Sequence, residues 1–442
     1  MDINELYELY LQHPSVETDT RKIKPGDIFF ALKGLNFNGN HYAKTALDAG
    51  ASFCIVDEAT GYSNEKIIQV NDSLQTLQQL AKKHREQFTI PFLAITGSNG
   101  KTTTKELVHA VLSSTHKTYT TTGNLNNHIG VPLTILKIKK DAAFAVIEMG
   151  ANHMGEIESY CDYTLPTHGL ITNCGKAHLQ GFGSEANIKK GKGELYDHLR
   201  KYNGSAFIFW DYDYLREMSA GIPMLIKYGT SNHEVAVAGR ITNQTGFLEI
   251  IISNGAAIME IKTKLVGGYN LPNILAAVAV GKAFNIEDEQ IRSALQNYIP
   301  SNSRSQLIEI GSNKIILDAY NANPSSMKVA VENFAVMSGS KKVLLLGGMM
   351  ELGAESLAEH KKLVELIQQY NWEHIVLVGN DFKNLPENLI HFTTVTAAKE
   401  WYAQQEFHDT IMLIKGSRSM QMEQILDKWD DQKNMPSESP DI

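Results

Sequence analysis

A glycine-rich segment that ends in lysine and threonine carries the clearest chemical signal in the sequence. The apolar run Phe92–Ile95 leads into it, and apolar residues at helical spacing follow it. Glycines let backbone N–H groups close around phosphate oxygens at the positive end of a helix dipole. Lys101 would then neutralise the β- and γ-phosphates, and the Thr102 hydroxyl would bind Mg²⁺. The residues predicted to bind the nucleotide here are Gly97, Ser98, Asn99, Gly100, Lys101, Thr102 and Thr103.

The general phosphate loop has one more glycine, at the position where this chain has Ile95. A plain strand–turn–helix connection is therefore the alternative interpretation of this segment. The apolar strand before the loop and the helix after it favour phosphate binding.

Two polar residues follow other expected strands of the same region. Glu148 ends the apolar run that starts at Phe144, and His178 comes shortly after the strand around Leu170. In open α/β sheets ligands collect beyond the carboxyl ends of the strands, where Glu148 could bind the metal of the nucleotide. The alternatives are a solvated acid and a loop histidine that is satisfied locally.

Lys192 lies on the apolar face of an expected helix. It is four residues from both Ile188 and Tyr196, so helical geometry places the three side chains together. Gly191 and Gly193 on either side would let another group approach closely. A lysine in this place requires an anion or a covalent change, unless its stem extends out to solvent.

The elements that must position these residues fall into three α/β groups. Short strands and a helix through Leu74–Ala81 predict a small amino-terminal domain over residues 1–88. Long apolar strands alternating with helices predict a central domain over residues 89–300, with a mostly parallel sheet and helices on both faces. A third, Rossmann-like α/β domain is predicted over residues 301–442.

In the third domain, strands are predicted at 342–346, 375–378 and 410–414, followed by a helix from Met422. The residues from Asn434 onward are predicted to form a frayed polar tail. Asn323 and Pro324 have the types expected at the N-cap and first position of a helix.

The composition is that of a globular protein. The 442 residues are 43% hydrophobic and 20% charged, which excludes a disordered chain, a collagen-like repeat and a coiled coil. A formal net charge of -8 gives no electrostatic reason to expect a nucleic-acid or anionic-membrane partner. Three widely spaced cysteines, an acidic amino terminus and the lack of a long apolar stretch predict a cytoplasmic protein without a membrane span.

Taken in order, several motifs resemble those of the Mur ligases of peptidoglycan synthesis. They include Thr96-Gly-Ser-Asn-Gly-Lys-Thr, Gly123-Asn-Leu-Asn-Asn-His-Ile-Gly-Val-Pro, Glu148-Met-Gly-Ala-Asn-His-Met-Gly-Glu-Ile, Asp318-Ala-Tyr-Asn-Ala-Asn-Pro-Ser-Ser-Met, Gly348-Met-Met-Glu-Leu-Gly and Lys415-Gly-Ser-Arg. The two motifs that start at Asp318 and Gly348 resemble the branch that adds D-alanyl-D-alanine to UDP-N-acetylmuramoyl-tripeptide. The resemblance implies a monomeric, ATP-dependent, amide-forming ligase that works through an acyl phosphate and releases ADP and phosphate.

The resemblance also implies roles for individual residues. Two magnesium ions would be held by Thr102, Glu148, His178 and Lys192, the lysine as a carbamate, and Lys101 would act with them in catalysis. Asn273, Arg304 and Asp318 would contact the nucleotide. Thr20, Arg21, Lys33 and Gly34 would lie in the domain that binds the uridine nucleotide.

The chain departs from the family pattern at His128, Gly191 and Tyr269, where an acid, an alanine and a histidine are usual. Another ligase of the same build, such as MurE or a folylpolyglutamate synthetase, is a rival interpretation, although the Asp-Asn-Pro-Arg motif expected of MurE is missing. A nucleotide-gated binding protein that performs no ligation is a second rival. The third residue of the acceptor peptide, diaminopimelate or lysine, stays open.

Overall fold

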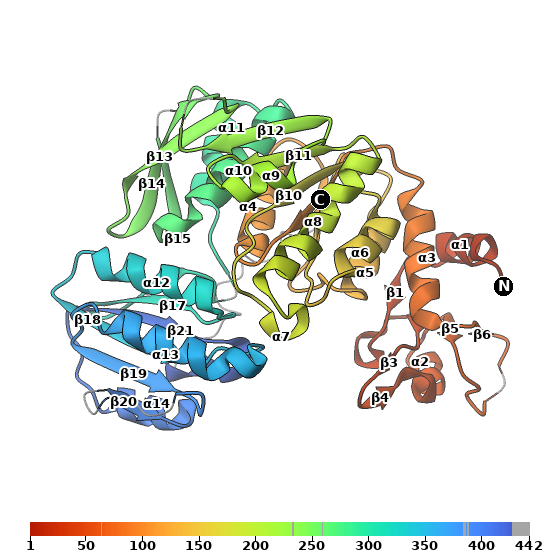
Figure 1. The fold of residues 1–442 in the computed structure, drawn as a ribbon. Helices are drawn as coiled ribbons and strands as arrows, with labels where there is room; N and C mark the ends of the chain where they lie inside the picture. The colour runs from red at the N-terminus through yellow and green to blue at the C-terminus, as the bar shows by residue number, and fades with distance from the viewer. Residues whose placement is uncertain are drawn as a thin grey trace.

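The computed structural model describes residues 1–62, 64–231, 234–258, 260–301, 303–382, 386 and 389–426. Three large sheets and one small hairpin sheet follow one another along the chain. In Figure 1 the amino-terminal part lies at the right, the carboxyl-terminal part lies at the lower left, and the central part joins them across the top. Among the described helices, none has the length and apolar character needed to cross a membrane.

The amino-terminal sheet has four parallel strands in the order β1-β2-β5-β6. Its two middle strands, β2 and β5, are almost wholly buried. Its strands and the hairpin beside them are β1 (Val16–Glu17), β2 (Ile28–Phe30), β3 (Lys33–Gly34), β4 (Phe37–Asn38), β5 (Phe53–Val56) and β6 (Ile67–Gln69). Its helices are α1 (Ile3–Gln12), η1 (Thr20–Lys22), η2 (Gly39–Tyr42), α2 (Ala43–Asp48) and α3 (Ser73–Arg85).

The central sheet has nine strands in the order β15-β14-β13-β12-β11-β10-β7-β9-β8, and only the pairs β13–β14 and β14–β15 are antiparallel. Every residue of β7 and β9 is buried, as expected for strands in the interior of a parallel sheet. The strands are β7 (Phe92–Thr96), β8 (Thr118–Thr120), β9 (Phe144–Glu148), β10 (His168–Ile171), β11 (Ser205–Phe209), β12 (Met224–Gly229), β13 (Val237–Asn243), β14 (Phe247–Asn254) and β15 (Ile261–Val266).

Two groups of helices pack around this sheet. One group joins α4 to α10 and α11, and the other joins α6 to α8, α5 and α3. The helices are α4 (Lys101–Ser113), α5 (Gly130–Leu136), α6 (Glu156–Thr164), α7 (Leu179–Phe182), α8 (Glu185–Lys201), α9 (Asp213–Met218), η3 (Gly268–Asn270), α10 (Leu271–Ala283) and α11 (Asp288–Asn297).

The carboxyl-terminal sheet has six strands in the order β16-β17-β21-β18-β19-β20, and only β16 is antiparallel to its neighbour. Alternate residues of β18 belong to different apolar clusters: Leu344 packs with α12 and α13, whereas Val343 packs with α14 and η6. Both faces of the sheet are therefore covered. The elements are β16 (Gln306–Ile310), β17 (Asn313–Asp318), α12 (Pro324–Val336), β18 (Lys341–Gly347), η4 (Gly353–Glu355), α13 (Ser356–Ile367), β19 (His374–Val378), β20 (Ile390–Phe392), α14 (Val395–Ala403), β21 (Thr410–Lys415), η5 (Arg418–Met420) and η6 (Met422–Ile425).

Two local predictions for this part have different outcomes. Asn323 is the N-cap of α12, where its side chain accepts a hydrogen bond from Ser326 N at 2.9 Å, and Pro324 is the first helical residue, which confirms the prediction. The helix predicted from Met422 is wrong as far as the described residues extend: they form only the short 3₁₀ helix η6, which ends at Ile425. The predicted tail from Asn434 lies outside the described residues.

One apolar core joins the amino-terminal helices to the central sheet. Leu6 of α1 and Leu77 of α3 belong to the same buried cluster as Phe92 and Ile147 of the central strands. A cation–π contact reinforces this junction, because Arg85 at the end of α3 stacks on Phe92 with its guanidinium carbon 3.7 Å from the ring centre. The amino-terminal part is thus fixed to the central domain by shared burial.

Arg85 also binds the carboxyl end of α6. Its guanidinium donates to Thr164 O at 2.9 Å, to Leu165 O at 3.0 Å and to Phe88 O at 2.7 Å. The last carbonyls of a helix lack intrahelical partners and carry its negative dipole end, so a buried cation there is well placed.

We expect Arg85→Met to lower the free energy of unfolding by about 3 kcal/mol, because it removes several charge-assisted hydrogen bonds and leaves buried carbonyls unpaired. Urea unfolding followed by circular dichroism measures the loss. Lys82→Ala, an exposed change in the same helix, is the control and should change stability by less than about 0.5 kcal/mol. Equal effects of the two substitutions would contradict a structural role for the Arg85 contacts.

Candidate active site

The glycine-rich loop connects the buried strand β7 to the start of α4. Gly97 and Gly100 adopt φ values of 141° and 79°, in the region that favours glycine. A Cβ atom on Gly97 would lie 2.0 Å from Thr172 Oγ1, so a side chain there would displace the neighbouring strand end. The first turn of α4 has no side-chain cap, which leaves its N–H groups for an anion. Ile95 stands at the position of the usual first glycine. It is a buried residue of β7, so the chain is still a strand at this position and the loop begins after it.

Lys101 is folded back over this loop. Its ammonium group donates to Gly97 O at 2.8 Å and to Ser98 O at 3.3 Å. Burial lowers the pKa of Lys101, while the carboxylate of Glu148 opposes this effect. The ammonium group therefore lies against the backbone that a phosphate group would approach.

Glu148 ends β9 and is almost completely buried, with 1% of its surface exposed. Its Oε1 accepts hydrogen bonds from Thr102 Oγ1 at 3.1 Å and from Asn126 Nδ2 at 2.7 Å. Among the described residues, Glu148 Oε2 has no hydrogen-bond partner although it is buried. A carboxylate oxygen in this condition favours a cation as the missing partner.

Lys192 lies inside the protein, as the helical spacing predicts. Its side chain in α8 is 1% exposed, and its ammonium group donates to Ala151 O at 3.1 Å and lies 5.2 Å from the centre of the Phe182 ring. Burial, with a smaller contribution from the charge of Lys101, lowers the pKa of Lys192 to about 7. The interpretation in which the stem extends to solvent is wrong.

His178 makes a contact with the third domain. It is the N-cap residue of the short helix α7, with φ 54°, and its Nδ1 contacts Glu351 Oε2. His178 lines the same cavity as Glu148, but its contact with a carboxylate is to Glu351. This contact lowers the pKa of Glu351 by hydrogen bonding, against the effect of partial burial.

A cavity of about 1050 Å³ lies between the central and carboxyl-terminal parts. Besides the phosphate loop, Glu148 and His178, it is lined by Asn273, Arg304 and Asp318, the residues predicted to contact the nucleotide. The structure thus brings to one space residues that are far apart in the sequence.

The three nucleotide-contact candidates are held differently. Asn273 accepts from Thr104 Oγ1 at 3.0 Å and donates to Asn270. Asp318 is bound at 2.5 Å by the buried Lys415, which belongs to the Lys415-Gly-Ser-Arg motif. Arg304 lies with its guanidinium carbon 3.5 Å from the centre of the Tyr320 ring. Its buried Nε lacks a hydrogen-bond partner within the described part of the chain, and one more acceptor would satisfy it.

The residues predicted in the uridine-nucleotide domain lie elsewhere. None of Thr20, Arg21, Lys33 and Gly34 lines the cavity. Arg21 is exposed and pairs with Asp19 at 2.7 Å. The cavity beside the phosphate loop is therefore not the place where these four residues could act.

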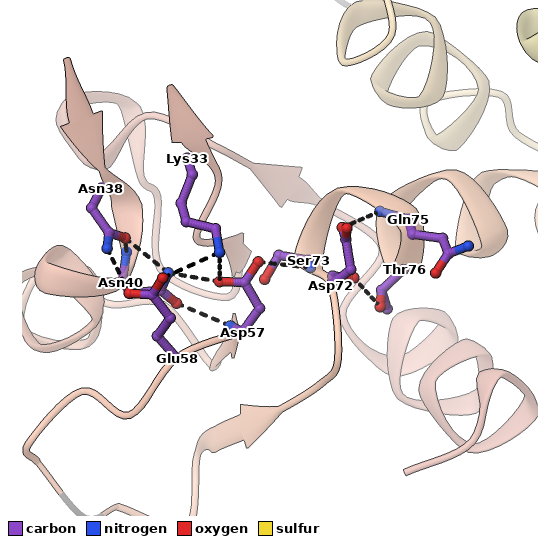
Figure 2. A network of polar contacts seen from close by, with 9 residues as sticks. All are labelled: Lys33, Asn38, Asn40, Asp57, Glu58, Asp72, Ser73, Gln75 and Thr76. Carbon is purple, nitrogen blue, oxygen red and sulfur yellow. Dashed lines mark hydrogen bonds and ion pairs between the residues drawn. The ribbon is translucent and has the colours of Figure 1, made fainter. Parts of the chain in front are cut away.

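Lys33 belongs to a polar network between the β3–β4 hairpin, the segment after β5 and the start of α3 (Figure 2). Its ammonium group lies 3.3 Å from Asp57 and 3.2 Å from Glu58, and Asn38 donates to Glu58 at 2.7 Å. Asp57 also accepts a hydrogen bond from Ser73 N, at the start of α3. The network links the β3–β4 hairpin to the helix that joins the central domain.

Some contacts between the domains were not predicted. Asn323 Nδ2 donates to Asn99 Oδ1 at 2.7 Å, and Lys176 N donates to Ser325 Oγ at 2.8 Å. Lys176 also lies 3.3 Å from Glu359 of α13. Asn126 and Asn323 lie in motifs that sequence analysis singled out, but no pattern in the sequence pairs them with Glu148 or with Asn99.

The residues of the cavity fit a magnesium ion that is carried by a nucleotide. Within the described ranges, no three His, Cys, Asp or Glu side chains gather closely enough to hold a metal unaided. Mg²⁺ in phosphate-transfer sites takes one or two carboxylates together with phosphate oxygens and water. Glu148 Oε2 and the Thr102 hydroxyl supply such a partial set.

Comparisons with known proteins agree over the whole length. Family models match three segments: "Mur ligase family, catalytic domain" at residues 14–85, "Mur ligase middle domain" at 95–281 and "Mur ligase, glutamate ligase domain" at 303–418. The chain is similar to the UDP-N-acetylmuramoyl-tripeptide–D-alanyl-D-alanine ligase of Bacillus subtilis, with 32% identity over 96% of this chain and 94% of the relative. With the same ligase of Escherichia coli it shares 34% identity over 93% and 92%.

Solved structures give the same result. A MurF structure from Acinetobacter baumannii matches with a TM-score of 0.84 and 30% identity, covering 93% of this chain and 92% of that one. A Thermotoga maritima MurF ligase solved in complex with ADP matches with a TM-score of 0.83 and 26% identity, covering 94% and 97%. With three family models matched in order along the chain and relatives of more than 30% identity over more than nine-tenths of it, the chain belongs to the Mur ligase family.

Proposed function

We propose that this enzyme joins D-alanyl-D-alanine to UDP-N-acetylmuramoyl-tripeptide in peptidoglycan precursor synthesis, with hydrolysis of ATP to ADP and phosphate. The observation that carries the proposal is the cavity lined by the phosphate loop, Glu148 and Arg304, in which Glu148 Oε2 and Arg304 Nε lack hydrogen-bond partners among the described residues. Relatives that are named for this reaction match more than nine-tenths of the chain. ATP and UDP-linked precursors are cytoplasmic metabolites, so we place the enzyme in the cytoplasm, acting as a monomer.

Each part of the chain has a share in this reaction. We propose boundaries near residues 88 and 300, so that residues 1–88 bind the UDP-sugar peptide, 89–300 bind ATP and 301–442 close over it and bring the dipeptide. Thr20, Arg21, Lys33 and Gly34 are our candidates for contacts to the UDP end. These residues lie outside the cavity beside the phosphate loop, which suits a long substrate whose peptide end alone reacts there.

The chemistry requires activation of a carboxylate. The terminal carboxylate of the tripeptide takes the γ-phosphoryl group of ATP, which gives an acyl phosphate and ADP. The amine of D-alanyl-D-alanine then attacks the acyl carbon, and inorganic phosphate leaves as the amide bond forms. No protein nucleophile is required, so the enzyme contributes mainly positioning and charge stabilisation.

Lys101 is our candidate for the group that neutralises charge on the transferred phosphoryl. Its ammonium group is already held beside the loop by Gly97 O and Ser98 O, and a phosphate can replace those acceptors without a change of backbone. Asn273, Arg304 and Asp318 hold the nucleoside in the same cavity.

Thr102, Glu148, His178 and a carbamate of Lys192 are our candidates for magnesium ligands, for two ions. The metal would neutralise phosphate charge. The Lys192 carbamate is supported by the surroundings of its amine, which has a carbonyl oxygen and an aromatic ring as neighbours, and by a pKa near 7 that leaves much of it neutral at cellular pH. A neutral amine adds to CO₂, and the product is a carboxylate in place of a cation.

Purified enzyme with Mg²⁺ and ATP should release ADP over many turnovers only when both UDP-N-acetylmuramoyl-tripeptide and D-alanyl-D-alanine are present, and mass spectrometry should find the UDP-linked pentapeptide. Lys101→Ala should lower kcat by about 10³-fold through loss of the phosphate clamp, whereas the exposed Lys137→Ala should leave the rate unchanged.

Replacing the dipeptide with diaminopimelate or glutamate tests the rival ligases, and preference for either would overturn the assigned substrate. Acceptors that end in diaminopimelate or lysine identify the third residue.

Incubation with ¹³C-bicarbonate should give a carbamate signal by NMR in the enzyme and in Lys190→Ala, an exposed change on the same helix, but not in Lys192→Ala. Because only the neutral amine reacts and burial lowers the pKa of Lys192 to about 7, the signal should grow as the pH rises from 6 to 8. Lys192→Ala should be inactive and partly rescued by short carboxylic acids. Full activity of that variant without rescue would exclude the carbamate.

A further inference from the structure

The loop after β18 crosses from the third domain to the central domain and ends in the contact with His178. Glu351 lies in this loop, four residues beyond the end of the strand at Gly347. Its carboxylate pairs with His178 Nδ1, and its carbonyl accepts a hydrogen bond from Gln180 N at 3.0 Å. Side chain and backbone of Glu351 therefore both bind the α7 segment.

The backbone is shaped for this contact on both sides. Glu351 and His178 have φ values of 62° and 54°, in the left-handed region that residues other than glycine rarely adopt. Such conformations are retained where the surrounding structure imposes them, and they gather at functional sites. Two of them face each other here across a domain boundary.

The pairing determines which ring nitrogen is free to bind a ligand. In a neutral imidazole only one ring nitrogen carries a proton, and the Glu351 carboxylate, which can only accept hydrogen bonds, favours that proton on the Nδ1 atom it contacts. Nε2 then keeps its lone pair, which is the arrangement seen where a histidine binds a metal and a carboxylate orients the ring from the other side. His178 lines the cavity that also contains Thr102 and Glu148.

We propose that Glu351 is a positioning residue for the magnesium site, and that it orients His178 from the carboxyl-terminal domain through Nδ1. The proposal rests on the proposed role of His178 as a metal ligand. Its consequence is that the site is complete only when the third domain is closed on the central one. Metal binding and domain closure then favour each other, because each requires the same His178 geometry.

A second ion pair between the same two domains provides a matched control. Lys176 of the central part lies 3.3 Å from Glu359, a buried residue of α13 in the third domain. This pair stabilises the same closed arrangement but does not involve His178. Glu359→Ala therefore weakens the interface between the domains without removing the orientation of the imidazole.

Mn²⁺ is the probe for the test, with the full-length enzyme and a non-hydrolysable ATP analogue. Electron paramagnetic resonance of free Mn²⁺ gives the binding curve without turnover. Glu351→Ala should weaken Mn²⁺ binding by about tenfold or more, the usual effect of removing a partner that orients a ligand. Glu351→Gln, which keeps an acceptor oxygen, should lose less, and Glu359→Ala, which weakens closure but leaves the contact of Glu351 with His178 in place, should lose clearly less affinity than Glu351→Ala.

The double variant shows whether Glu351 acts on Mn²⁺ binding through His178. In a His178→Ala background, Glu351→Ala should cause no further loss, because two residues that act as one unit are not additive. Wild-type Mn²⁺ affinity in Glu351→Ala, or an equal further loss in the double variant, overturns the inference. If His178→Ala itself binds Mn²⁺ normally, the metal role of His178 fails and this inference with it, whereas formation of the pentapeptide still tests the ligase function separately. Thermal unfolding of each variant without ligands checks folding, and the half-exposed Glu351 should tolerate replacement.

Discussion

A buried carboxylate with an unpaired oxygen is the constraint on which the site depends. Glu148 Oε1 is bound by Thr102 and Asn126, but Oε2 faces the cavity unpaired within the described structure, and an unpaired buried charge is unfavourable. Lys101 lines the same cavity, and its charge lowers the pKa of the buried Lys192 further. A metal-bound nucleotide would compensate the charges in the cavity, and a carbamate would replace the buried cation of Lys192.

The order of strands explains why these charges meet. In the central sheet β7 lies between β10 and β9, so the carboxyl ends of three parallel strands stand side by side. The phosphate loop leaves β7, Glu148 ends β9, and the segment to His178 leaves β10. Hydrogen bonds between the strand ends fix their spacing, such as Thr172 Oγ1 to Asn99 O at 2.6 Å. The apolar sequences of the three strands bury them side by side in the sheet, and the site forms at the edge where their carboxyl ends meet.

Local patterns in the sequence predicted the features that depend on neighbours along the chain. The helical spacing around Lys192 predicted its burial, and the types of Asn323 and Pro324 predicted the start of α12. The contacts of His178 with Glu351 and of Asp318 with Lys415 join segments distant in sequence, so no local period indicates them. The helix predicted from Met422 is an error of another kind, because here a local pattern predicted an element that does not form as expected. The apolar residues do pack against the third sheet, but from a short 3₁₀ helix.

The way the domains meet also differs between the two ends of the chain, and the difference suits the reaction. The amino-terminal part shares an apolar core with the central sheet and is held by the buried Arg85, so it moves with the ATP site as one body. The third domain meets the loops of that site through polar contacts, such as Asn99 with Asn323 and Lys176 with Glu359. When the domains separate, water can replace each partner in these contacts, so the net change in free energy is small. Such an interface opens readily to admit three substrates and closes when they supply the missing charges. A firm amino-terminal junction would keep the proposed UDP substrate in register with the phosphate loop, while the polar junction would leave the third domain free to perform the proposed closing motion.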